Sequence, residues 1–127
     1  MAAATVFFGK TYGEAMGLLV EARDYFAKGE PRERLLPPAE RLRLVSESLR
    51  VTTRLTRVMA WLMTERAVQA GEMSQQEALA DPDRLAHSAI CMEEAEAGRV
   101  PPRLAELLDR SRRLYVRVAR LDDLARG

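Results

Sequence analysis

Apolar and charged residues repeat with helical periodicity along most of this 127-residue chain. The longest such pattern runs from Arg41 to Ala70 without an internal proline or glycine. It stops at Gly71, a residue suited to a helix C-cap. At 3.6 residues per turn the pattern predicts one helix of about eight turns. No segment of useful length alternates with a period of two, so no strand is expected.

The long predicted helix carries two adjoining rows of residues that are mostly apolar. One row consists of Leu42, Val45, Leu49, Thr52, Met59 and Met63, and the other of Leu44, Val51, Leu55, Val58 and Leu62. A helix with two such rows needs more than one neighbour to cover them. We therefore expect this segment to be the central element of a helical bundle.

Two further helices are expected, one on each side of the long one along the chain. The first begins near Thr11, where Thr11 and Glu14 match a capping box, and it ends at Gly29. The last runs from Arg103 to about Ala125, with leucines at a seven-residue spacing that is typical of a helix-packing seam, namely Leu107, Leu114 and Leu121.

Two breaks separate the long helix from the last one. Ser74 with Glu77 matches a second capping box and opens a short helix that Asp81 and Pro82 interrupt. Residues 83–95 predict another short helix or an irregular packing segment. The whole pattern predicts one all-α domain over residues 1–127: a three-helix bundle in up-down-up order, with a long central helix and short helical decoration between helices 2 and 3.

Composition and charge exclude several classes of protein. With 47% hydrophobic and 31% charged residues, the chain has the balance of a soluble folded domain. A net charge of +1 gives no reason to expect nucleic acid or a membrane surface as a partner. The single cysteine, Cys91, fits a reducing compartment. The N-terminus lacks the features of a signal peptide, so we expect a cytoplasmic protein.

Candidate catalytic and metal-binding groups are few. The chain has one histidine, one cysteine and no glycine-rich phosphate loop. His87, Cys91 and Glu94 would share one face of a helix, an acceptable geometry for a metal site. Ordinary partly buried residues are the better interpretation, because soft-metal sites collect more His or Cys than this. We expect no catalytic residue, no cofactor and no metal.

Charged residues form a row along one side of the long helix: Arg43, Glu47, Arg50, Arg54 and Arg57. One interpretation is a docking surface for an acidic partner, and these are the residues we predict for partner binding. The other is a solvated face whose charges are compensated by acidic residues of neighbouring helices. The last helix has a similar row with the same two interpretations, made of Arg110, Arg113, Arg117 and Arg120.

Glycines recur every four residues near the first helix, at Gly9, Gly13 and Gly17. Each glycine inside a helix costs about 0.8–1 kcal/mol relative to alanine, so their presence needs a reason. Close approach of another helix of the same chain is the favoured reason. The alternative is self-association, in which Gly13 and Gly17 contact a second copy and form a homodimer.

Three segments of the chain carry a family resemblance. They are FFGKTYGEAMGLLVEARDYF at 7–26, RLRLVSESLRVTTRLTRVMAWLMTERAVQAGEMS at 41–74 and LAELLDRSRRLYVRVARLDD at 104–123, with VTTRLTRVMAWL and SRRLYVRVARLDD as the most specific parts. In this order they resemble the alphaproteobacterial family of the regulator of CtrA degradation, RcdA.

The resemblance implies a three-helix bundle that acts as a non-enzymatic adaptor of the ClpXP protease. Such an adaptor binds cytoplasmic cargo, such as response regulators, and helps to bring it to a protease primed by partner factors, so that cell-cycle regulators are destroyed on time. The family relies on surfaces, so the resemblance implies no active-site residue. The alternative function is a homodimeric helical structural module without a role in proteolysis.

Overall fold

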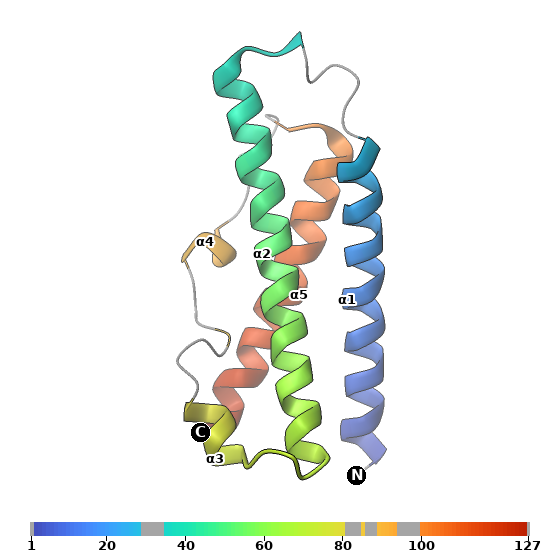
Figure 1. Ribbon diagram of the computed structural model, residues 1–127, viewed down its shortest axis with the longest axis vertical. Coiled ribbons are helices and arrows are strands. Elements are labelled where there is room, and N and C mark those ends of the chain that lie inside the picture. Colours follow the sequence, from blue (N-terminus) through green and yellow to red (C-terminus); the bar gives the residue numbers. More distant parts are fainter. Residues whose placement is uncertain (1, 29–34, 81–84, 86–88, 94–99, 127) are drawn as a thin grey trace.

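Three long helices form the bundle in the computed structural model, which describes residues 2–28, 35–80, 85, 89–93 and 100–126. They are α1 (Ala2–Lys28), α2 (Pro38–Gln69) and α5 (Pro102–Arg126), with the short helices α3 (Gln75–Ala80) and α4 (Ala89–Met92) between α2 and α5. Figure 1 shows α1 and α2 side by side with α5 behind them. No strand occurs among the described residues, so the predicted all-α class and three-helix core are confirmed.

The first helix begins well before the predicted start. α1 opens at Ala2, and Thr11 lies inside it with its side chain buried. The capping box predicted at Thr11 is therefore wrong. The preceding residues are rich in alanine, the best helix former, and contain no proline, so the helix continues through them.

Both ends of α2 follow local sequence signals. Pro37 is the N-cap residue and Pro38 occupies the first helical position, where the missing N–H has no helical partner to lose. At the other end Gly71 has a φ of +78°, and its N–H bonds to the oxygen of Val68 while that of Glu72 bonds to Ala67. This pair of bonds is a Schellman motif, which confirms the predicted C-terminal glycine cap.

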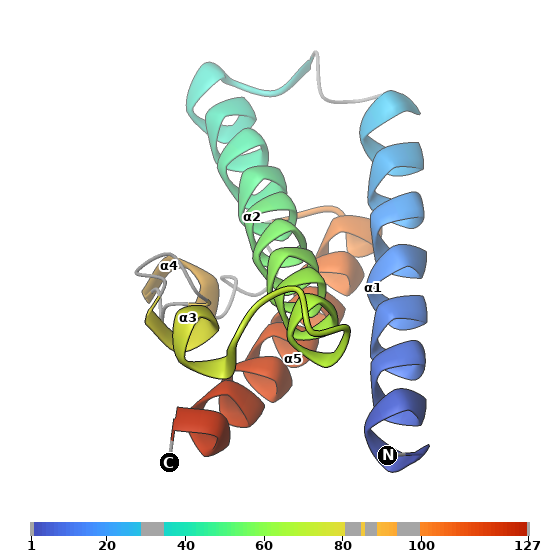
Figure 2. The same ribbon diagram turned by 60° about the horizontal axis from the view of Figure 1, so that its bottom comes forward.

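The order of helix directions differs from the prediction. Arg54 of α2 contacts Leu108 of α5, and Trp61 contacts Asp122, so the contact partners advance in the same direction along both helices. α5 is therefore parallel to α2 and antiparallel to α1, and up-down-up is wrong. The short helices α3 and α4 lie beside α2 on the side away from α1 (Figures 1 and 2).

Only one of the two predicted apolar rows of α2 enters the core. The row of Leu44, Val51, Leu55, Val58 and Leu62 is buried against residues of α1 and α5, which include Leu18, Leu104, Leu114, Tyr115 and Val118. The other row is largely exposed: Leu42 retains 66% of its accessible surface, Leu49 59% and Met63 41%. Coverage of both rows was predicted and is wrong, because α1 and α5 lie on the opposite side of α2.

Candidate protein-interaction site

Arg54 is the most deeply buried member of the predicted partner-binding row. It lies on α2 between the buried residues Val51 and Val58, and 0% of its surface is accessible to solvent. The guanidinium donates to four oxygens, at 2.8 Å for Cys91 O, 2.6 Å for Glu93 O, 2.8 Å for Leu108 O and 3.2 Å for Ser111 Oγ. Three of these four acceptors are backbone carbonyls and the fourth is a side-chain hydroxyl, all of this chain.

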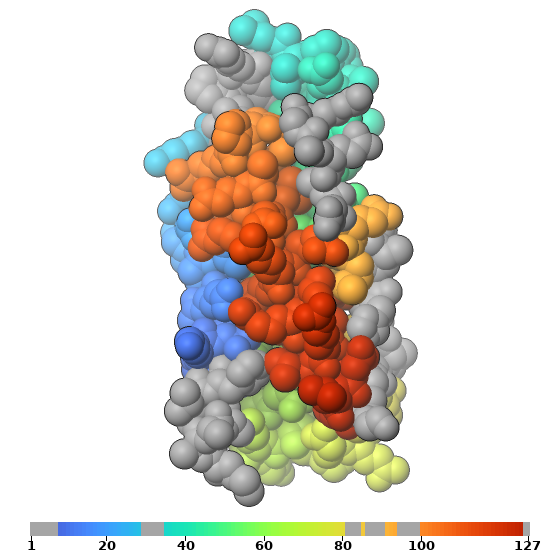
Figure 3. Space-filling model, turned by 180° about the vertical axis from the view of Figure 1, so that it is seen from behind, coloured from blue at the N-terminus to red at the C-terminus, as the bar shows by residue number. Residues whose placement is uncertain are grey.

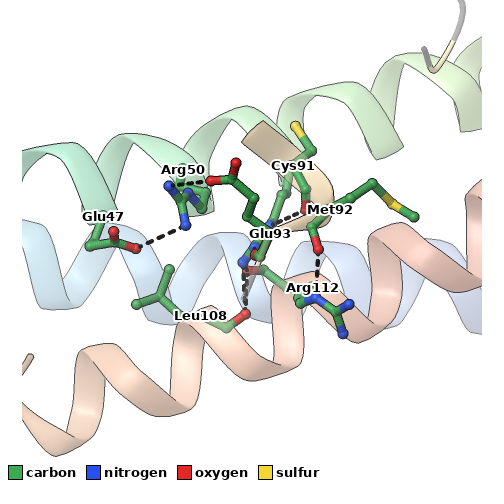
Figure 4. A network of polar contacts seen from close by, with 9 residues as sticks. Glu47, Arg50, Cys91, Met92, Glu93, Leu108 and Arg112 are labelled. Carbon is green, nitrogen blue, oxygen red and sulfur yellow. Dashed lines mark hydrogen bonds and ion pairs between the residues drawn. The ribbon is translucent and has the colours of Figure 1, made fainter. Parts of the chain in front are cut away.

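Three backbone carbonyls at the C-terminal end of α4 accept hydrogen bonds from arginines of α2 and α5. The carbonyl oxygens of Cys91 and Glu93 bond to Arg54, and that of Met92 bonds to Nε of Arg112 on α5 at 2.8 Å (Figure 4). The last carbonyls of a helix lack helical partners and carry partial negative charge, so cations stabilise them. Arg54 of α2 and Arg112 of α5 therefore attach α4 to both of these helices.

Burial changes the acidity of this arginine. Removal from water, with a smaller effect from the neighbouring Arg50 cation, lowers the pKa of Arg54 to about 10. The side chain still carries a proton at neutral pH. A buried cation of this kind is tolerable because its donors are bonded to carbonyl dipoles.

Arg50 lies at the edge of the same cluster. Its guanidinium is 3.5 Å from a carboxylate oxygen of Glu47 and 3.4 Å from one of Glu93 (Figure 4). The side chain is 17% exposed, and Glu47 is buried. These residues therefore compensate each other's charge. The second interpretation expected compensation on a solvated face by acidic residues of neighbouring helices, whereas Glu47 belongs to α2 itself and is buried.

The predicted partner-binding row needs correction. Arg54 and Glu47 are buried, so they cannot face a partner in this fold, and Arg50 is paired within the chain. Arg43 and Arg57 are half-buried. The regular spacing of the charges in the sequence did not predict that α4 packs against this part of α2. A usable signal was present at Arg54, a single charged residue flanked by Val51, Leu55 and Val58 within the core row.

Arginines of α5 connect that helix to α1. Arg110 forms a two-bond ion pair with Glu21, at 2.9 and 2.8 Å, and Arg117 pairs with Glu14. The hydrogen bonds between Arg110 and Glu21 lower the pKa of the Glu21 carboxyl and raise that of Arg110. Compensation by acidic residues of a neighbouring helix is thus confirmed for these two positions, and Figure 3 shows α5 lying across the back of the bundle beside α1.

The helical glycines have open space around them. A Cβ added at Gly9, Gly13 or Gly17 would meet nothing within 4 Å. Close packing by another helix of the same chain, the favoured explanation, is therefore wrong. Gly13 and Gly17 are exposed on α1, and their role in self-association stays a prediction.

Two residues of the predicted metal-site geometry, His87 and Glu94, lie outside the described residues. Cys91 is buried in the core with a free thiol. Within the described ranges, no group of three His, Cys, Asp or Glu side chains is placed to hold a metal ion. None of the helices that the structure describes is long and apolar enough to cross a bilayer.

Comparison with known proteins identifies relatives of this fold. A family model described as "Protein of unknown function (DUF1465)" matches residues 1–127. Among solved structures, the crystal structure of RcdA from Caulobacter crescentus CB15 shares 37% identity with this chain at a TM-score of 0.69. The match covers 93% of this chain and 89% of that one. No curated protein matches. The resemblance to RcdA seen in the sequence is therefore confirmed.

Proposed function

The chain belongs to the DUF1465 family, and we propose that it serves as a non-enzymatic adaptor in regulated proteolysis, acting through protein–protein contacts. The observation that carries this proposal is the likeness to RcdA, which extends over nearly the whole of both chains. Identity of 37% over that length supports a shared surface as well as a shared fold.

The use of polar side chains in this structure agrees with such a role. Arg54, Arg112 and Asp122 are hydrogen-bonded between helices and serve packing. Catalysis needs a nucleophile, an acid–base group and a charge stabiliser that converge on one point. The proposal instead assigns the work of the protein to exposed helix faces, which bind other proteins without chemistry.

The finer proposal concerns partners. We infer that the chain acts in the cytoplasm with ClpXP-associated factors and binds cargo such as response regulators that control the cell cycle. The support is again the RcdA likeness, since this chain's own residues do not name a cargo.

Two linked experiments test the proposal. The tagged chain is used to recover partners from its native lysate, and the recovered proteins are identified by mass spectrometry. Purified ClpX and ClpP of the same organism are then given one recovered response regulator, with and without the chain. Faster loss of the regulator, while the chain itself persists, supports an adaptor. Absence of protease factors from the recovered set, together with an unchanged rate of degradation, would overturn it.

A homodimeric structural module is the second candidate, favoured by one observation. Gly13 and Gly17 are exposed in the middle of α1, where alanine in their place would make the helix more stable. A second copy could use the space above them for close helix contact. Light scattering at increasing concentration tests this candidate, with Gly13→Leu as the variant expected to dissociate a dimer without unfolding the chain.

A further inference from the structure

The outer side of α2 presents an uninterrupted uncharged surface. Between Arg41 and Arg66, every exposed position of the helix is uncharged: Leu42, Val45, Ser46, Leu49, Thr52, Thr56, Ala60 and Met63. We call these eight residues the outer face of α2. At 100° per residue they fall within an arc of about 120°, and at 1.5 Å per residue they extend over about 32 Å.

This surface is unusual for a chain with 31% charged residues. Leu42, Val45 and Leu49 retain 66%, 49% and 59% of their accessible surface. Contiguous exposed apolar residues of this kind mark interaction sites in soluble proteins. Their spacing also has a meaning, because steps of three and four residues from Leu42 to Met63 are those of the a and d positions of a coiled-coil seam.

The charges around the outer face of α2 have one sign. Arg41 and Arg66 are exposed at its two ends, and Arg57 is half-buried along one edge. No ion pair found between described residues includes any of these three arginines. On the helical wheel Glu40 and Glu65 lie outside the arc.

This pattern disfavours a second copy as the occupant. A parallel pair of α2 helices would bring Arg41 to Arg41 and Arg66 to Arg66. An antiparallel pair centred on Thr52 would bring Arg41 close to Arg66 at both ends. Like charges opposed across an interface weaken it, whereas opposite charges favour the correct partner.

We propose that the outer face of α2 binds an amphipathic helix of a partner protein whose apolar seam is flanked by Glu or Asp. The apolar seam would cover Leu42, Val45, Leu49 and Met63, and the carboxylates would meet the arginines at the ends and edge. The inference rests on the proposed function only in taking a protein as the partner. It supplies the chemical class of partner and moves the binding surface away from Arg54.

A pair of designed peptides tests this surface on the full chain. Both have about four heptads with leucine at a and d; one carries Glu at every e and g position and the other carries Lys. Repulsion between the like charges of two copies limits the self-association of each peptide. Fluorescence anisotropy should show the Glu peptide binding at least about tenfold more tightly than the Lys peptide, with affinity that falls as salt is raised.

Variants place the binding on the predicted residues. Leu49→Glu should weaken binding of the Glu peptide about tenfold or more. Thr56→Glu is a second variant that should also weaken this binding, and it changes a position that is already polar and exposed. Leu124→Glu is the matched control, because Leu124 is 77% exposed on α5. Arg41→Glu combined with Arg66→Glu should weaken binding about fivefold, whereas Arg23→Glu, at an exposed site on α1, should not.

Several results would overturn the inference. These are equal binding of both peptides, binding of neither, or an equal effect of Leu124→Glu. Dissociation of a chain dimer by Leu49→Glu would assign the face to a second copy. Binding to phosphatidylglycerol vesicles that Leu49→Glu abolishes would assign it to lipid. Because the peptides contain no protease factor, these failures leave the degradation assay as the separate test of the adaptor role.

Discussion

Arg54 donates a hydrogen bond from Nε to the backbone oxygen of Cys91 at 2.8 Å, joining α2 to the end of α4. The two residues are 37 positions apart in the chain. The bond holds α4 against α2. An arginine that the sequence pattern places in a row of surface charges therefore helps to position α4.

Loss of this arginine should destabilise the fold. In Arg54→Met the side-chain volume is largely kept, but the buried carbonyls of Cys91 and Leu108 and the partly buried carbonyl of Glu93 lose their donors. Unsatisfied buried acceptors cost about 1–3 kcal/mol each at most, with relaxation reducing the sum, so we expect a loss of about 3 kcal/mol. Urea unfolding followed by the fluorescence of Trp61, the one tryptophan of the chain, measures it.

The control for this change is another arginine of α2. Arg57 is half-buried and has no ion pair among the described residues, so Arg57→Met should change the free energy of unfolding by less than about 0.5 kcal/mol. Arg54→Lys keeps the charge but loses the planar fork of donors, and it should fall between the two. Equal stability of the Arg54→Met and Arg57→Met variants would contradict the role given to the buried guanidinium.

Stability at acid pH should depend on the pair formed by Glu21 and Arg110. Arg110 lowers the pKa of Glu21 below its ordinary value of 4.5. The pair therefore stabilises the fold fully above that value, and its contribution is lost as pH falls through the lowered pKa. Both side chains are over a third exposed, so we expect only about 0.5 kcal/mol at neutral pH.

Glu21→Gln measures this contribution. The difference in unfolding free energy between the parent and the variant should be largest at neutral pH and should shrink below about pH 4.5, where Glu21 loses its charge in the unfolded and then the folded state. Glu106→Gln is the matched control, because Glu106 also faces Arg110, but at 3.5 Å and with greater exposure. A difference that grows as pH falls would be the wrong sign.

The hydrogen bond between Trp61 of α2 and Asp122 of α5, two helices that run parallel, should also contribute to stability. Trp61 Nε1 donates to Asp122 Oδ1 at 3.1 Å, and Asp122 is 1% exposed. Asp122→Ala should cost about 2 kcal/mol because it leaves the indole N–H without this buried acceptor. Asp122→Asn keeps an oxygen acceptor and should cost less. Thermal unfolding followed by circular dichroism compares the two, and equal losses would show that the bond to Trp61 does not matter.

Local signals in the sequence were enough to predict the helices that they begin or end. Gly71 ends α2 by its own backbone preference, as predicted, and the N–H of Glu77 bonds to Ser74 Oγ at 3.0 Å as the second capping box predicts. Periodicity also identified the buried row of α2. These features depend on residues within a few positions of each other.

Features that depend on distant residues were not predictable in the same way. The direction of α5 is visible only in contacts between distant residues, such as that of Arg54 with Leu108 and that of Trp61 with Asp122. Two short helices between breaks are compatible with either direction of the last helix. The burial of Arg54 depends on the end of α4, 37 residues away. The exposed row of α2 has the same periodicity as the buried one, so periodicity could not tell which row α1 and α5 cover.

The glycines of α1 allow stability and self-association to be separated. Gly13 is exposed inside a helix, with nothing within 4 Å of an added Cβ, so Gly13→Ala should raise the free energy of unfolding by about 0.5–1 kcal/mol. Gly71→Ala should lower it by about 1 kcal/mol, because φ at Gly71 is +78°. If a second copy packs on Gly13, the alanine variant will be more stable as a monomer yet weaker as a dimer in light scattering. Greater stability with unchanged association would remove Gly13 from any dimer contact.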